Sequence, residues 1–590
     1  MKILGIHDGH NATAALMING KIEVAISEER LTYKKNDMGF PKNSIDKCLE
    51  LTGVRGVDID AVAFSIKSLP LHYLRVKREY AFSIRDWLNE QEFYWKPLLF
   101  DNVLNTKYIE KVCSNEKFKN KQWYNYEDIP LILSKEENDK YLEDIRYKTL
   151  LNLYGIDKEK IFFIDHHSCH QYYAYFASPY RNKRTLLFTC DGGGDNTNGT
   201  VAIAENDTIK ELGRNNNTDL ARIYRYITLI LGMKIGEHEY KVMGLAPYSS
   251  QYEIQKCNKA FQDIFHVPDI LIEYKNRPSD LFFYFRDLLA DCRFDGIAGA
   301  VQQMVEEVGS NWFDKVAKKL KIDRVVFSGG LSMNVKLNKK IGELNSINEI
   351  YCPTSGGDES TAIGACYYTN SLLNKPIIQK DIRNNYLGLS YTNEDIRTFI
   401  SQLSRYNIQE GFTIDEIADL LAKNIVIARF AGKMEFGARS LGNRSIIANP
   451  SNENIVKKIN TQIKFRDFWM PFAPSILDSY VQKYLVNPKQ LMSDQMTQTF
   501  DVTDLGKKDL IAALHPFDYT VRAHIVSREL NPDYYDLIKV FSQKTGIGAL
   551  LNTSFNLHGL PIVCSPKNAI HVFDNCELDA MIIGDFLITR

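Results

Sequence analysis

The chain has 590 residues, of which 44% are apolar and 25% are charged, and its formal net charge is -1. This length is too great for one hydrophobic core, so we expect two or more domains. The near-zero charge argues against a nucleic-acid partner, which usually requires a basic excess. No early run of about 18 apolar residues is present, so we predict neither a signal peptide nor a membrane contact. Ten scattered cysteines indicate no disulfide framework, and the chain is predicted to be a cytoplasmic enzyme.

Two stretches of the N-terminal half repeat one pattern: a strand, a turn with an acid and glycine, and a hairpin. The expected strands are 2–6, 14–18 and 21–26 in the first copy, and 186–190, 200–204 and 209–212 in the second. Asn19-Gly20 marks the first hairpin, because Asn-Gly between apolar runs favours a tight turn. Such a duplication is typical of the actin-like ATPase architecture, whose two turns hold a nucleotide's phosphates from opposite sides. The predicted fold class is therefore α/β.

A histidine-rich segment, 164–170, lies just before the second copy. His166 and His170 are four residues apart, which places both imidazoles on one face of a helix. Asp191 follows the next apolar run, and imidazoles with carboxylates suit a divalent metal such as Zn, Fe or Mn. Gly192, Gly193 and Gly194 come next, and glycines let backbone N–H groups close around phosphate oxygens. The alternative is that the two histidines cap or pack a helix; His167 and Cys169 are interpreted as structural.

Two further glycine turns follow buried strands. Gly329 and Gly330 end the strand 325–328, and Asn334 lies on the helix after them, where the actin-like class approaches the nucleoside. Asp358 follows a second glycine pair, which makes it a candidate fourth metal ligand with Asp191 as the third. The alternative for Asp358 is an N-cap of the helix 360–368.

A second domain follows a linker that is poor in apolar repeats. Its loop 431–445 contains Arg439 and Arg444 among glycines, and guanidinium groups suit phosphate because their donors pair with two oxyanion oxygens at once. Lys464, Arg466 and Arg522 follow, and then the stretch 551–556, in which Asn552 and Ser554 are assigned to cofactor binding. The alternative is a solvated basic loop.

The segment 69–147 is rich in aromatic residues. Its aromatics include Tyr73, Tyr80, Phe82, Trp87, Phe93, Tyr94, Trp95, Phe100, Tyr108, Trp123, Tyr124 and Tyr126. Many of these residues must belong to the core. Because aromatic faces with carboxylates such as Glu90, Glu92 and Asp101 suit a sugar-like or cationic molecule, we also expect the segment to shape a pocket for a small hydroxylated substrate.

These motifs resemble the NodU/CmcH family of O-carbamoyltransferases, which act in antibiotic and nodulation-factor biosynthesis. The resemblance covers essentially the whole chain and is most specific at Glu239–Pro247, Gly432–Pro450, Ile463–Pro474 and Leu551–Asn556, with the His-His-x-x-His run and Gly5 to His10 in agreement. It implies an N-terminal domain, 1–370, similar to the threonylcarbamoyl-tRNA transferase. A linker, 371–390, and a YrdC-like domain, 391–590, would follow.

The resemblance also implies the chemistry. Carbamoyl phosphate and ATP would give a carbamoyl-adenylate, whose carbamoyl group passes to a hydroxyl of a small metabolite such as a sugar or aminoglycoside. The metal is iron in the family, Fe(II) here, with Mg as an additional option, and its ligands would be His166, His170, Asp191 and Asp358. His10 would be the general base, and carbamoyl phosphate or the adenylate would be held by Lys35, Arg439, Lys464 and Arg522. Neither a nucleic acid nor a membrane is an expected partner, and a homodimer is one option.

One residue departs from the family pattern. The family usually has Glu-Glu-Arg-x-x-Arg-x-Lys where this chain has Glu28 to Lys35, and Tyr33 replaces the second arginine. The main alternative function is a tRNA threonylcarbamoyl transferase, against which the net charge and the C-terminal domain argue. A sugar kinase of the actin-like class would leave the C-terminal loop unexplained. A nucleotide-binding scaffold would show no dependence on carbamoyl phosphate.

Overall fold

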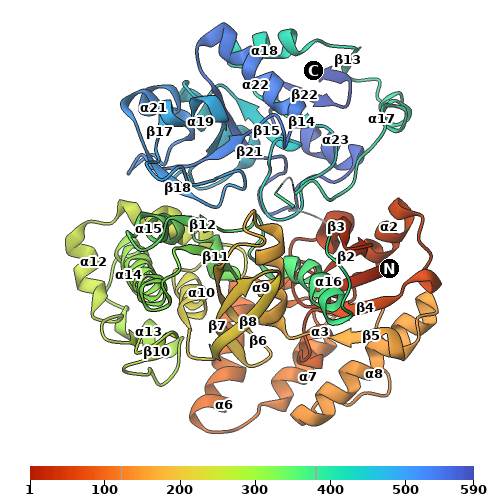
Figure 1. Cartoon of the computed structure of the whole chain (residues 1–590), viewed down its shortest axis with the longest axis vertical. Coiled ribbons are helices and arrows are strands. Elements are labelled where there is room, and N and C mark those ends of the chain that lie inside the picture. The colour runs from red at the N-terminus through yellow and green to blue at the C-terminus, as the bar shows by residue number, and fades with distance from the viewer. Residues whose placement is uncertain (121–122, 379–381, 384) are drawn as a thin grey trace. The chain divides into compact units, whose positions relative to one another are not determined.

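The computed structural model describes residues 1–120, 123–378, 382–383 and 385–590. The chain forms two compact units (Figure 1). The first comprises Met1–Leu337, Leu344–Ile347 and Gly356–Asp381, and the second comprises Asn338–Glu343, Asn348–Ser355 and Ile382–Arg590. Both units mix helices with sheets, so the fold is α/β as predicted. The sequence-based domain limits at 370 and 391 stay predictions.

The first unit contains two sheets with one strand order. The first sheet runs β3-β2-β1-β4-β5, and four strands of the second follow it as β8-β7-β6-β11. In each, the first three strands are antiparallel and the fourth pairs in parallel with the third. The strands are β1 (Lys2–His7), β2 (Thr13–Ile18), β3 (Lys21–Ser27), β4 (Ala61–Phe64), β5 (Ile161–Phe163), β6 (Thr185–Gly194), β7 (Thr197–Glu205), β8 (Thr208–Asn215) and β11 (Arg324–Ser328). The unit is thus internally duplicated.

Helices α9 (His166–Ala177) and α16 (Thr361–Leu372) pack against each other between these sheets (Figure 1). Their approach is very close, because a Cβ atom at Gly364 would lie 1.9 Å from the Cys169 carbonyl oxygen. A Cβ atom at Gly5 of β1 would lie 2.0 Å from the Ala362 oxygen of α16. Glycines at these positions therefore bring the histidines of α9 and the segment before α16 beside the first sheet.

The aromatic segment lies between β4 and β5 and is mostly helical. Its elements are α3 (Leu71–Leu74), α4 (Arg78–Ala81), α5 (Ile84–Glu90), the π-helix η2 (Gln91–Trp95), α6 (Lys96–Phe100), α7 (Thr106–Ser114) and α8 (Lys135–Tyr154). Phe82 and Trp87 are buried in a core shared with Phe282. Phe93 and Phe100, in contrast, are each 53% exposed. Some of the aromatics therefore belong to the core, as the structural alternative required.

Five further helices of the first unit pack on the second sheet or on one another. They include α10 (Leu220–Ile230), α11 (Glu239–Leu245), α12 (Gln251–Asn258), α13 (Phe283–Leu288) and α14 (Phe294–Leu320). Phe313 of α14 stacks on Phe188 of β6, with ring centroids 3.9 Å apart. Among the described residues, no helix combines the length and the apolar character that crossing a membrane requires.

The second unit is built on an eight-stranded mixed sheet of order β13-β23-β22-β14-β15-β21-β16-β20. Its strands are β13 (Asn407–Glu410), β14 (Ile427–Phe430), β15 (Arg444–Ala448), β16 (Ala473–Leu477), β20 (His524–Val526), β21 (Ala549–Ser554), β22 (Ala580–Ile583) and β23 (Phe586–Thr589). Helices α17 (Asn393–Ile400) and α23 (Pro566–Asp574) pack in one core cluster of this sheet, and α18 (Ile414–Ala422) and α22 (Pro532–Thr545) pack in another. Apolar strand residues alternate between these two clusters, as expected for a sheet covered on both faces.

Candidate active site

Helix α9 begins at His166 because Asp165 caps it. The Asp165 carboxylate accepts a hydrogen bond from the Ser168 backbone N–H at 2.9 Å, so the histidines themselves do not cap the helix. The Asp195 carboxylate accepts a hydrogen bond from the His166 backbone N–H, also at 2.9 Å. This bond holds the loop after Asp191 against the start of the helix. The side chains of His166 and His170 lie one turn apart and are fully buried.

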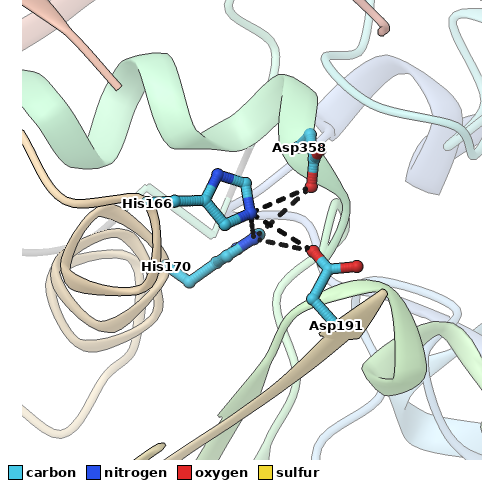
Figure 2. A group of neighbouring side chains, drawn as sticks. All are labelled: His166, His170, Asp191 and Asp358. Carbon is cyan, nitrogen blue, oxygen red and sulfur yellow. Dashed lines mark hydrogen bonds and ion pairs between the residues drawn. The ribbon is translucent and has the colours of Figure 1, made fainter. Parts of the chain in front are cut away.

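Four side chains from three elements converge beside α9 (Figure 2). The Nε2 atoms of His166 and His170 lie 3.2 Å apart. Asp191 Oδ2, on β6, lies 3.1 Å from His170 Nε2 and 3.5 Å from His166 Nε2. Asp358 Oδ1, on the short helix η6 (Asp358–Ser360), lies 3.5 Å from both nitrogens. The structure therefore brings together all four side chains that the sequence predicts as metal ligands.

The geometry of this cluster fits one divalent ion. Bonds of about 2.1 Å separate neighbouring ligand atoms by about 3.0–3.4 Å. The distances from the two Nε2 atoms to each other and to the carboxylates are close to this, at 3.1–3.5 Å, and all four ligand atoms lie within 4.8 Å of one another. Two neutral imidazoles and two carboxylates form a donor set that suits zinc, iron or manganese. Asp358 does not cap a helix, because neither η6 nor α16 has a side-chain cap. Its side chain is thus available as a ligand.

The charges of these neighbouring side chains shift one another's pKa values strongly. Burial alone would lower the pKa of His166, but the carboxylates of Asp358 and Asp191 outweigh it and raise that pKa well above its usual value. Burial would raise the pKa of Asp358, and the positive charges of His10 and His166 hold it well below its usual value instead. His167, one residue along, behaves differently. Burial lowers its pKa to about 3, and its ring contacts Thr189 Oγ1 at 2.7 Å, as expected for a structural histidine.

His10 contacts the same carboxylate from its other side. His10 Nδ1 lies 3.4 Å from Asp358 Oδ2, whereas Asp358 Oδ1 faces His166 and His170. The His10 side chain is 37% exposed, so it borders solvent beside a buried cluster. His7, three residues earlier, contacts the His10 backbone oxygen through Nε2 at 3.1 Å. Burial lowers the pKa of His7 to about 4, so this ring is a neutral support for the turn that carries His10.

The glycines after Asp191 allow the cluster to form. A Cβ atom at Gly194 would lie 2.4 Å from the His166 ring. Gly193 has a φ of 128°, which disfavours other residues. The predicted turn is in fact a bulge within β6: pairing with β7 shifts between Cys190 and Gly194. Gly329, with a φ of 90°, approaches the Cys190 carbonyl, and a Cβ atom at Gly330 would lie 3.1 Å from Asp191 Oδ1.

Two predicted site residues of the first unit have other contacts. Asn334 lies before α15 (Val335–Glu343) rather than within a helix, and its Oδ1 accepts a hydrogen bond from the Leu337 backbone N–H at 3.0 Å. Its side-chain amide also pairs with that of Gln302 through two hydrogen bonds of 3.0 Å. Lys35 Nζ lies 3.8 Å from Glu29 Oε1, and Tyr33 adopts a left-handed conformation at the end of α1 (Glu28–Thr32). Roles of Asn334 and Lys35 in ligand binding stay predictions.

The second unit gathers three guanidinium groups. Burial lowers the pKa of Arg522 well below its usual value, and the positive charges of Arg439 and Arg466 lower it further. Arg466 is held by Asn460, whose Oδ1 accepts a hydrogen bond from Nε at 2.8 Å, and it stacks 3.9 Å from the centroid of the Phe472 ring. Like charges that repel one another in a half-buried position favour an anion that compensates them, so an anion site at these arginines stays a prediction.

Lys464, Asn552 and Ser554 connect loops of the second unit. Lys464 is buried, and its Nζ donates to Ser554 and Asn556, with 2.7 Å to the Ser554 carbonyl oxygen and 2.9 Å to that of Asn556. Asn552 donates a hydrogen bond to Ser475 Oγ at 2.9 Å. These contacts hold the end of β21 in position, and direct ligand contacts of the three residues stay predictions.

Comparison with known proteins identifies the family. The family model described as carbamoyltransferase N-terminus matches residues 2–367, and the one described as carbamoyltransferase C-terminus matches residues 418–590. The chain belongs to the carbamoyltransferase family. This carbamoyltransferase is 31% identical to an uncharacterized protein of Methanocaldococcus jannaschii over 100% of this chain and 99% of that protein.

Two named relatives agree with this membership. Nodulation protein NolNO of Sinorhizobium fredii is 26% identical over 98% of this chain and 79% of its own length. The 3'-hydroxymethylcephem-O-carbamoyltransferase of Streptomyces clavuligerus is 24% identical over 44% of this chain and 47% of its own length. The predicted NodU/CmcH-type family and the predicted O-carbamoyltransferase enzyme are thereby confirmed.

Sequence reasoning assigned no functional role to three residues of this carbamoyltransferase that the structure makes prominent. Arg466 joins the arginine cluster, and His7 supports the His10 turn. Glu435 is buried, and its Oε1 accepts hydrogen bonds from the backbone N–H groups of Leu441 and Asn443, both at 2.7 Å. The His-x-x-His spacing and the Lys-Phe-Arg run were visible signals for the first two. No local pattern marks Glu435, because its partners come from a loop that closes around it.

Proposed function

We propose that this carbamoyltransferase forms a carbamoyl-adenylate from carbamoyl phosphate and ATP, and passes its carbamoyl group to a hydroxyl of a small metabolite. The observation that carries this proposal is that the two carboxylate oxygens of Asp358 contact different groups. One oxygen faces the pair His166 and His170, and the other faces His10. A candidate metal site and a candidate general base are thus joined through a single carboxylate, an arrangement that suits acyl transfer to an alcohol.

The arginine cluster of the second unit supports the activation half of the reaction. Water would first release phosphate from carbamoyl phosphate and leave carbamate. A carbamate oxygen would then attack the α-phosphorus of ATP, and pyrophosphate would leave. This step brings two anions together, so it needs fixed positive charge, which Arg439, Arg466 and Arg522 supply.

The cluster of His166, His170, Asp191 and Asp358 would hold the divalent metal, which we assign as Fe(II) by resemblance. When bound, the ion would supply Lewis-acid polarisation of a phosphate or carbonyl oxygen. The chain's own residues orient this site: Ser328 Oγ lies 3.3 Å from His170 Nδ1, and Asp195 holds the backbone of His166. Such outer contacts fix the rings so that both Nε2 atoms face the carboxylates.

His10 would act on the acceptor. Because Nδ1 faces Asp358 Oδ2, a proton on Nδ1 would leave Nε2 as the basic nitrogen for the acceptor hydroxyl. Nε2 would take the hydroxyl proton while the oxygen attacks the carbamoyl carbon, and AMP would leave with the electron pair of the broken carbon–oxygen bond. Asp358 orients the ring in this scheme, and His7 supports the turn that holds it.

The test combines two products in one assay. Purified enzyme with ATP, carbamoyl phosphate and a panel of hydroxylated metabolites should release pyrophosphate, and mass spectrometry should find one acceptor with an added carbamoyl group. Release of ADP with a phosphorylated acceptor would indicate a sugar kinase and contradict the proposal. Carbamoyl transfer to bulk tRNA, with none to small molecules, would favour the tRNA-modifying alternative.

A further inference from the structure

A cavity of about 420 Å³ lies in the helical segment between β4 and β5. Its lining residues include Arg75, Glu110, Cys113, Lys119, Asn120 and Tyr126. A cavity of this size accommodates a small organic molecule. The lining combines apolar surface with charged groups of both signs, so it suits a small molecule whose carbon skeleton carries charged or polar substituents.

The wall of this cavity contacts the catalytic turn at two points. Asn120 Nδ2 donates a hydrogen bond of 3.2 Å to the Met38 carbonyl oxygen, and Met38 forms an isolated β-bridge with His10. Near Tyr126, the Tyr124 hydroxyl donates a hydrogen bond of 2.6 Å to Asp8, which lies between His7 and His10. The chain segment that forms the cavity wall is therefore joined by hydrogen bonds to the segments that position the proposed base.

Arg75 gives the cavity an uncompensated positive charge. Its Nη2 donates to the Ile129 and Pro130 carbonyl oxygens at 2.5 and 3.2 Å, and its guanidinium lies 5.1 Å from the centroid of the Tyr126 ring. The Arg75 Nε atom is buried without a hydrogen-bond partner, and no carboxylate in the described part of the chain forms an ion pair with this residue. Burial also lowers the pKa of Arg75. Arg75 is half-buried, and an oxyanion could pair with its charge and accept a hydrogen bond from the unpartnered Nε.

We propose that this cavity binds the carbamoyl acceptor and that the acceptor carries an oxyanion, a carboxylate or phosphate, which pairs with Arg75. The proposal rests on the proposed carbamoyl transfer and adds to it the class of acceptor: a hydroxylated acid or phosphate ester. Glu110 also lines the cavity and would accept hydrogen bonds from the acceptor's hydroxyl groups.

Cys113 lines the same cavity and provides a direct probe of its charge. Its thiol would be labelled with sulfonatoethyl (anionic) and trimethylammoniumethyl (cationic) methanethiosulfonate, each normalised to its rate with free cysteine, and peptide mass spectrometry would measure modification at Cys113 alone. The anionic reagent should react roughly fivefold faster, the ratio that one fixed charge at about 8 Å in water produces between reagents of opposite sign. Arg75→Met should abolish this preference. Equal rates in the unmodified enzyme would overturn the proposal.

Two control variants show whether the labelling preference comes from the charge of Arg75 itself. Arg75→Lys keeps the charge and should keep the preference even if the contacts with residues 129 and 130 weaken. Lys107→Met removes one exposed charge from α7 outside the cavity and should also keep it. A preference that disappears equally in Arg75→Met and Lys107→Met would contradict the assignment, because it would reflect the overall charge of the segment.

A ligand that occupies the cavity should protect Cys113 from labelling, so protection by different compounds identifies the class of ligand. D-Glucose 6-phosphate should slow the labelling of Cys113, and D-glucose at the same concentration should not. Labelling that both sugars slow equally, or that neither slows, would overturn the requirement for an oxyanion, and equal protection by carbamoyl phosphate would overturn the assignment to the acceptor. Pyrophosphate release is measured on the same unlabelled preparation. Its absence would contradict the proposed function, whereas the labelling result would still test ligand binding in the cavity.

Discussion

The two candidate sites of this carbamoyltransferase balance their charges in opposite ways. In the first unit, histidines and carboxylates of opposite charge converge, so each raises or lowers the pKa of the other toward the charged form. In the second unit, Arg522 lies among other arginines, and all of these charges have one sign. The carboxylates of the first arrangement suit a divalent cation, to which the histidines would bind after losing their protons, and the second arrangement suits an anion. We therefore propose a metal ion as the ligand of the first unit and an anion as the ligand of the second, and the predictions below are ways to break this comparison.

The largest effect is expected from removing a ligand of the first cluster. His170→Ala should lose the bound metal and lower carbamoyl transfer by at least about 10³-fold, because a Lewis acid contributes several kcal/mol to such a step. The fold should remain, since the cluster is one site in a large unit. Elemental analysis and circular dichroism would measure both. His167→Gln is the matched control: it alters a buried neighbour that contacts Thr189, and it should keep the metal. Full metal occupancy in His170→Ala would remove His170 from the ligand set.

A substitution in the arginine cluster of the second unit should impair the activation step and leave metal binding intact. Arg522→Met should lower pyrophosphate release by about 10²–10³-fold, because preorganised charge at a reacting phosphate has this magnitude. Metal content should not change. The control Arg528→Met removes an exposed arginine of the same unit that pairs with Asp536 and should have no effect on release. Unchanged pyrophosphate release in Arg522→Met would mean that the arginine cluster is not the activation site.

A single methyl group tests how tightly the first cluster is held. Gly194→Ala would put a Cβ atom 2.4 Å from the His166 ring, so the ring must move. We expect metal affinity to fall about 10–100-fold, as it does when the orientation of a ligand is disturbed. Gly192→Ala is the control, because a Cβ atom there meets no atom within 4 Å. Equal metal affinities for the two variants would show that the bulge does not restrict His166.

The smallest effect is expected from Glu435, which supports the loop 431–445. Glu435→Gln replaces a buried carboxylate that accepts backbone hydrogen bonds from Leu441, Asn443 and Arg444. The neutral amide accepts these bonds more weakly, so the free energy of unfolding should fall by about 1–3 kcal/mol. Urea denaturation would measure this change, with the exposed Glu453→Gln as control. Identical stabilities would leave Glu435 without a structural role.

The sequence was most informative where a feature is local. The Asn-Gly hairpin and the strand–turn pattern predicted a duplicated unit, and the two sheets share their strand order. The spacing of His166 and His170 predicted one helix face, which α9 provides. Gly194 and Gly329 were recognised as glycines of a turn, but their reason is tertiary: each lies against an atom that a side chain would strike.

Features that depend on distant partners were not predictable. Nothing near Asn334 indicates that its amide pairs with Gln302, or near Lys464 that its ammonium group contacts the loop at Ser554. Both residues carry the polar groups of ligand-binding residues, and sequence alone cannot distinguish a polar group that holds a loop from one that holds a substrate. The buried pair of Arg146 and Asp8, 138 residues apart, is another example.

The most direct test of the account asks whether activation and transfer separate between the two units. The exchange of labelled pyrophosphate into ATP, in the presence of carbamoyl phosphate and without acceptor, should be measured for His10→Gln and Arg439→Ala. The account predicts full exchange in His10→Gln, which should nevertheless lose about 10²–10⁴-fold in carbamoyl transfer, and no exchange in Arg439→Ala. Equal loss of exchange in both variants would contradict the division of the two half-reactions between the histidine–carboxylate cluster and the arginine cluster.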